Sequence, residues 1–184
     1  MAALIAGSMI TLNAQQLDPR EPGLYAVNGE ESTLLTFTDA SQSSSGISIG
    51  IISLGKRQLE FKGATSGTEA HGKFVLVINP EQKSATRVLK NYKPFIKTMN
   101  PDDLMIIPLT VEKKKRVLDE GLFVNGFGTK LVHGVPFSWV QIADNAFEIE
   151  VPNLIPGEYG VALKFAELDT FDIKTLYGFY VTEE

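Results

Sequence analysis

The sequence predicts an all-β protein whose core is an antiparallel β-sandwich. Stretches in which apolar and polar residues alternate recur along the chain, as in strands that bury one face. Glycine, proline, asparagine or aspartate separates most of these stretches, and helix-period patterns are almost absent. About ten short strands in a chain of this length is the density expected of a sandwich or a barrel.

The first hairpin is predicted at Asn28-Gly29, because both residue types accept the positive φ of a two-residue hairpin turn. The flanking strands are "GLYAV" (23–27) and "STLLTFT" (32–38). The serine-rich stretch 39–46 is predicted as a loop, and "ISIGII" (47–52) as one half-buried strand.

The next two strands differ in pattern. "QLEFK" (58–62) alternates, which places Leu59 and Phe61 on the buried face. Residues 74–78 are apolar at every position, which is typical of a strand covered on both faces. We therefore expect this strand at the centre of a sheet.

The second half of the chain predicts one short helix and two further hairpins. The helix falls on "EQKSATRVLKNY" (81–92), before Pro94. One hairpin joins 104–112 to 116–121 through three lysines, and Pro108 marks its first strand as an edge strand or a bulged one. The other hairpin joins "VPFSWVQIAD" (135–144) to "AFEIEVP" (146–152).

Proline and glycine begin the strand that follows, in "PGEYGVAL" (156–163). Tyr159 is predicted to bury its ring at this corner and to hydrogen-bond backbone through its hydroxyl group. The stretch "PGLYAV" (22–27) is similar, which indicates two corners of the same kind. In the last strand, "LYGFYV", we expect Tyr177 and Phe179 to face inward.

The chain is divided by these patterns into three parts. Residues 1–14 carry no charge and combine an apolar run with small residues, which predicts a secretory signal peptide cut after Ala14. The alternative is a strand or helix of the folded domain. Residues 15–80 are then an N-terminal β lobe and residues 81–184 a C-terminal immunoglobulin-like β-sandwich, or the two lobes form one continuous domain.

Composition excludes several functions. The net charge of −5 gives no global field that favours nucleic acid. The absence of cysteine excludes disulfides, thiolate metal sites and cysteine nucleophiles. No apolar run reaches the about 20 residues that a transmembrane helix needs.

The order of several motifs resembles a group of exported bacterial proteins that is common in Bacteroidetes-like genomes. The motifs are "PGLYAV", "LEFKGA" (59–64), the fully apolar strand, the lysine-rich hairpin, "PGEYGVAL" and a closing "GFYV" (178–181). The resemblance implies an immunoglobulin-like or related β-sandwich and a location at the cell envelope, periplasmic or extracellular. It implies no catalytic residue.

The residue patterns themselves predict no catalytic residue, metal site or cofactor. Ser48 lies in a G-x-S-x-G pattern, but a nucleophile elbow needs a helix after the serine, and the residues that follow are strand-like. His71 and His133 stand 62 positions apart (133 minus 71) without ligand spacing. Acidic pairs such as Asp102-Asp103 suit turns as well as they suit calcium.

Aromatic residues and a cationic run remain as candidate contacts. Tyr92, Phe127 and Trp139 are candidate ligand-binding rings, although the alternating strand around Trp139 favours a core position for it. The run 113–116 holds four cations, and we interpret it as a solvated hairpin tip that protects strand edges.

We therefore expect a non-catalytic structural or protein-interaction module at the bacterial cell envelope, with an envelope protein or glycan as its partner. The alternative is a carbohydrate-binding module that uses loop aromatics. A third hypothesis is a hydrolase whose acid and base are carboxylates among Glu167, Asp169 and Asp172.

Overall fold

The computed structural model describes residues 18, 20–49, 52–78, 100–124, 133–165 and 170–183. Within these ranges the chain forms eleven strands and one short 3-10 turn (η1), and no α-helix. The elements are β1 (Gly23–Asn28), β2 (Glu31–Leu34), β3 (Phe37–Ile49), β4 (Ile52–Lys62), β5 (Lys73–Val77), η1 (Pro101–Asp103), β6 (Leu104–Glu112), β7 (Lys115–Val124), β8 (Ser138–Ala143), β9 (Ala146–Glu150), β10 (Gly157–Phe165) and β11 (Thr170–Val181).

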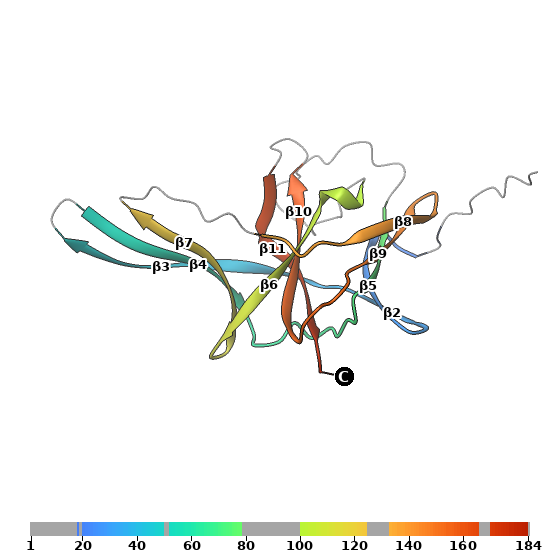
Figure 1. The fold of residues 1–184 in the computed structure, drawn as a ribbon, viewed down its shortest axis with the longest axis horizontal. Helices are drawn as coiled ribbons and strands as arrows, with labels where there is room; N and C mark the ends of the chain where they lie inside the picture. The colour runs from blue at the N-terminus through green and yellow to red at the C-terminus, as the bar shows by residue number, and fades with distance from the viewer. Residues whose placement is uncertain are drawn as a thin grey trace, which may run out of the picture.

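The strands form two antiparallel sheets (Figure 1). The first has five strands in the order β2-β1-β5-β9-β8, and the second closes into a barrel in the order β10-β11-β3-β4-β7-β6. The prediction of an all-β antiparallel fold is confirmed. The closure of one sheet into a barrel was not predicted from the sequence.

Alternation along the strands gives the barrel two buried surfaces. Tyr159 of β10 and Phe179 of β11 belong to a cluster that also holds Phe74 and Leu76 of β5, so the five-stranded sheet packs on this wall of the barrel. The Phe179 ring lies 4.9 Å from Phe74 and 5.1 Å from Tyr159, centroid to centroid. A second cluster holds residues of barrel strands only and fills the barrel: Leu59, Phe61, Ile107, Leu109, Leu118, Ala162 and Leu176.

The fully apolar strand is central, as predicted. β5 is the third of five strands, between β1 and β9. Its Phe74 and Leu76 face the barrel, and its Val75 and Val77 join a third cluster on the opposite face. The predicted inward positions of Leu59 and Phe61, each 1% exposed, are also confirmed.

The predicted strand 32–38 is two strands, because the chain changes sheets within it. β2 ends at Leu34 and β3 begins at Phe37. The N–H of Leu35 donates to Leu24 O at 2.8 Å in the five-stranded sheet. The carbonyl of the following residue, Thr36, accepts from Gly178 N at 3.2 Å in the barrel. Residues 35–36 thus connect the two sheets.

The predicted serine loop 39–46 and the predicted single strand 47–52 are both wrong. The serines continue β3, which pairs residue by residue with β4 from Ala40↔Phe61 to Ile49↔Ile52. The reversal of the chain therefore falls after Ile49, inside the stretch predicted as one strand.

The barrel closes only near one end. β3 pairs with β11 through residues 37–39, and β6 pairs with β7 through residues 110–112. Beyond these rows β3, β4 and β7 continue side by side as a three-stranded arm that extends away from the rest of the molecule (Figure 1).

The two tyrosine corners make the same hydrogen bond. Tyr25 Oη donates to Glu21 O at 2.8 Å, and Tyr159 Oη donates to Ile155 O at 2.8 Å, in each case four residues upstream. Both rings are buried, at 9% and 3% exposure. The predicted hydroxyl bond of Tyr159 is confirmed, and one corner stands in each sheet.

The three predicted hairpins are confirmed, but the register places the first turn at Gly29-Glu30 and not at Asn28-Gly29, and it puts Lys115 in β7 and not in the turn. β1 and β2 pair at Asn28↔Glu31, β6 and β7 at Glu112↔Lys115, and β8 and β9 at Ala143↔Ala146. β6 is not an edge strand, because it pairs with both β10 and β7. Pro108 faces β10 and lies outside the ladder with β7, which begins at Thr110.

Strands of both predicted lobes pair in each sheet. β5 pairs with β9 in the first sheet, and β4 pairs with β7 in the second. The division at residue 80 stays a prediction. The predicted signal peptide (1–14) and the predicted helix (81–92) lie outside the described residues.

Candidate functional site

The outer edge of the five-stranded sheet carries exposed apolar side chains. β8 is its last strand, and five of its six residues are exposed. The exposed fractions are 40% for Trp139, 55% for Val140 and 44% for Ile142. We call Ser138–Ile142, with the adjoining Asp102, the β8 edge.

The expected core position of Trp139 is wrong. Trp139 lies opposite Ile149, which is buried, so alternation placed it on the correct face of the strand. The strand itself stands at the rim of the sheet, where the ring packs edge-on against Phe147 at 5.5 Å and stays partly exposed.

A hydrogen bond fixes the orientation of the indole. Nε1 of Trp139 donates to Oδ1 of Asp102 at 2.8 Å. Asp102 belongs to the 3-10 turn η1, whose Asn100 caps the Asp102 N–H through its side chain. No local sequence pattern indicates this pairing, because the partners are 37 positions apart.

Among the described residues no strand pairs with the outer side of β8. Ser138–Ala143 contains no charged residue and no proline, whereas the opposite edge, β2, contains Glu31. A register shift between Gln141 and Ala143 is the one irregularity in the β8–β9 pairing. Unpaired edge backbone with apolar side chains is a template for the addition of another strand.

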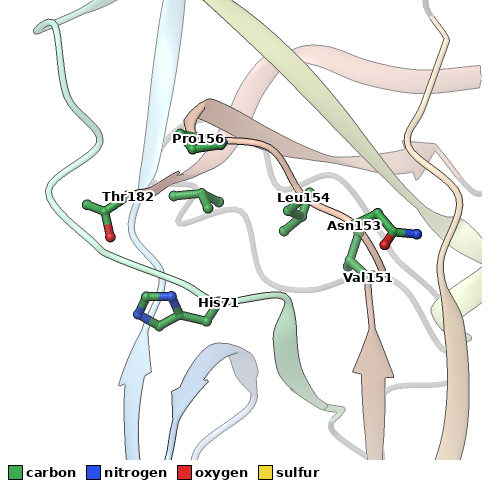
Figure 2. Close-up of a pocket in the computed structure, with 7 residues that line it drawn as sticks. His71, Val151, Asn153, Leu154, Pro156 and Thr182 are labelled. Carbon is green, nitrogen blue, oxygen red and sulfur yellow. The ribbon is translucent and has the colours of Figure 1, made fainter. Parts of the chain in front are cut away.

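A cavity of about 340 Å³ lies at the start of β10 and the end of β11 (Figure 2). Figure 2 shows His71 and Thr182 on one side of it and Val151 and Asn153 on the other. The lining residues are His71, Val151, Asn153, Leu154, Pro156, Val181 and Thr182.

The polar groups beside this cavity meet at the carboxylate of Glu69. Thr182 Oγ1 donates to Oε1 of Glu69, and Nε2 of His71 lies 3.7 Å from the same oxygen. The hydroxyl group is therefore bonded to the carboxylate and not to the imidazole.

A second hollow, of about 540 Å³, lies where β3 and β4 meet the β6–β7 turn. Lys115 forms an ion pair with Glu60 there, and this hydrogen bond lowers the pKa of Glu60. The hollow is lined by Asp39, Ala40, Ser41, Glu60, Phe61, Lys62, Gly63, Lys114 and Lys115.

A buried charged network contradicts part of the predicted solvated tip. Lys113, Lys114 and Lys115 are exposed, but Arg116 is 3% exposed. Its Nη1 donates to Ser66 Oγ at 2.9 Å and its Nη2 to Lys62 O at 3.1 Å. Ser66 in turn donates its hydroxyl and its N–H to Oε2 of Glu158, which is 6% exposed.

Burial lowers the pKa of Arg116, and the charge of Glu158 opposes that shift. We call Arg116, Ser66 and Glu158 the Arg116 network. Its hydrogen bonds connect the start of β7, the loop after β4 and the start of β10. A desolvated pair of charges bridged by a serine has no sequence signature.

Most other predicted candidates lie outside the described residues. This holds for Tyr92, Phe127, Glu167 and Asp169. Ser48 lies near the end of β3 and is followed by β4 and not by a helix. Among the described residues no group of three or more histidines or carboxylates is placed to hold a metal ion.

In the described part of the chain, no helix has the length and apolar character needed to cross a membrane. No protein family, no curated protein and no solved structure matches this sequence or fold.

Proposed function

We propose that this protein is a non-catalytic interaction module that binds an extended segment of a partner protein along the β8 edge. The observation that carries the proposal is the exposure of Trp139, Val140 and Ile142 on an edge strand without charge or proline. We assign the partner to the bacterial cell envelope, as the resemblance implies.

Strand addition suits this edge for two reasons. The backbone of an added strand satisfies the outward N–H and C=O groups of β8. Successive residues point to opposite faces, so Trp139 on one face and Val140 on the other both gain contacts from the same segment. Full burial of a side chain such as valine or isoleucine contributes about 1.5–3 kcal/mol.

An immunoglobulin-like sandwich is the fold relationship that we propose. The packing of the five-stranded sheet on one barrel wall supports it, as do the two tyrosine corners, which recur in sandwich folds of this kind. The closed barrel is a departure from that pattern.

We also propose export with cleavage after Ala14. Such cleavage spares the first described contact, in which Asp18 N donates to Asn145 Oδ1 at 2.7 Å in the β8–β9 turn. N-terminal sequencing of the protein from a native host tests this step, and retention of Met1 would overturn it.

Site-specific photo-cross-linking tests the module. A photoreactive amino acid at Val140 is expected to give a discrete adduct with an envelope protein in a native host. The matched position is Thr33 on the opposite edge strand, which is also exposed. Identical adducts from both positions, or none from Val140, would remove the β8 edge as the binding surface.

A second candidate is glycan binding, which the exposed Trp139 ring beside Asp102 favours. Affinity electrophoresis in polysaccharide gels tests it. Retardation that disappears in Trp139→Ala but persists in Val140→Ala supports a sugar platform; unretarded migration of the wild-type protein in every gel refutes it.

A further inference from the structure

We propose that the segment that binds the β8 edge is basic, with lysine or arginine alternating with apolar residues. This inference rests on the proposed function and adds the chemistry of the partner to it.

The outer face of the sheet is acidic next to β8. Glu148 lies directly opposite Val140, and Glu150 lies opposite Ser138, so these residues share one face of the sheet. Glu150 is exposed and Glu148 is half-buried. On the far side of β9, Lys73 lies opposite Glu150, which leaves Glu148 as the carboxylate nearest to the exposed Val140.

The other face of β8 carries the exposed Trp139 ring. Trp139 points to the opposite face from Val140, and the carboxylate of Asp102 accepts its indole hydrogen. Asp144 follows the strand in the β8–β9 turn and is exposed. Residues 133–150 contain no lysine or arginine, so no cation of the same segment offsets these carboxylates.

An alternating basic segment matches this arrangement, because all its cations point to one face of the sheet and all its apolar side chains point to the other. Its cations approach Glu148 and Glu150, and its apolar side chains cover the exposed Trp139 ring.

The same charges disfavour a second copy of this chain as the occupant. Pairing of β8 with β8 would leave the Glu148 and Glu150 pairs of the two copies three strand spacings apart, about 14 Å, where like charges still repel at low salt. A partner of opposite charge removes this conflict and associates faster at low salt.

Three capped octapeptides test the proposal. In each of them valine alternates with one other residue, which is lysine, serine or glutamate. Trp139 is the single tryptophan of the chain, so its fluorescence reports occupation of this edge directly. We expect the lysine peptide to bind about tenfold more tightly than the serine peptide. The glutamate peptide should bind least, and the affinity of the lysine peptide should fall as salt is added.

Two variants and one modified peptide serve as controls. Glu148→Lys should reverse the order of the lysine and glutamate peptides, whereas Glu31→Lys on the opposite edge strand should not change it. A lysine peptide with alternate backbone N-methyl groups should lose its affinity, because strand addition needs its N–H groups.

The outcomes separate the two proposals. If none of the peptides binds, strand addition at the β8 edge is wrong. If all three bind equally, or the glutamate peptide binds best, strand addition stands and the basic partner is wrong. A concentration-dependent dimer in sedimentation that is abolished by Val140→Lys would show that a second copy occupies the edge, and would also overturn the basic partner.

Discussion

Removal of the Arg116 guanidinium should destabilise the protein strongly, because it leaves Glu158 as a buried charge without its compensating cation. Arg116→Met keeps much of the side-chain length and removes three hydrogen bonds: to Ser66 Oγ at 2.9 Å, Lys62 O at 3.1 Å and Gly63 O at 3.3 Å. Breaking a buried ion pair from one side costs about 3–5 kcal/mol, and because Ser66 bridges these two charges we expect a cost near the lower value. A domain has about 5–15 kcal/mol of stability in total, so the loss is large.

A double-mutant cycle isolates the electrostatic part. Glu158→Gln removes the negative charge and keeps an oxygen that can accept from Ser66, so we expect a smaller cost of about 1–3 kcal/mol. The combination Arg116→Met/Glu158→Gln should cost at least about 1 kcal/mol less than the sum of the single changes, because no charge is then left buried.

Urea denaturation followed by tryptophan fluorescence and circular dichroism measures these costs from the midpoints and slopes. Lys115→Met is the matched control one residue away, and we expect little change, since its ion pair with Glu60 is at the surface. If Arg116→Met is too unstable to purify, Arg116→Lys keeps the charge and should be milder. Additive single costs, or a cost of Arg116→Met equal to that of Lys115→Met, would refute the reasoning.

The two tyrosine corners should contribute equally: Tyr25→Phe and Tyr159→Phe each remove one 2.8 Å hydrogen bond and should cost about 1 kcal/mol, additively in the double variant because the corners share no partner. Unequal shifts of the denaturation midpoint would show that the two hydrogen bonds contribute unequally to stability. A second prediction concerns stability at low pH. The hydrogen bond from Arg20 lowers the pKa of Asp18 from its ordinary value of 3.8. The pair therefore stabilises the fold fully at pH values above 3.8, and this contribution is lost as the pH falls through the lowered pKa. Asp18→Asn should therefore be less stable than the wild type at neutral pH and equal to it in strong acid, as measured by denaturation across pH; a constant difference would contradict the assignment.

Local patterns predicted the parts of the fold that depend on one strand and its immediate neighbour. The unbroken apolar run at 74–78 located the central strand, and Leu59 and Phe61 located a buried face. The tyrosine after Pro156-Gly157 located a corner and its hydrogen bond. Each of these features is determined within a few residues of sequence.

The remaining features depend on pairings between distant segments. Barrel closure needs Phe37 to pair with Tyr177, and no local pattern states which strand edges meet. Alternation assigned Trp139 to a face but could not show that its strand is the last in the sheet. Arg116 looks like its three lysine neighbours in the sequence, and only the fold buries it beside Glu158.

The position of β11 between β10 and β3 determines when the barrel can close during synthesis of the chain. Strands β3 and β4 are synthesised early, yet the ring that holds them is completed by a segment that ends at Val181. Until that segment has been made, the barrel lacks one of its six strands and stays open. Closure of the barrel therefore cannot precede the synthesis of β11.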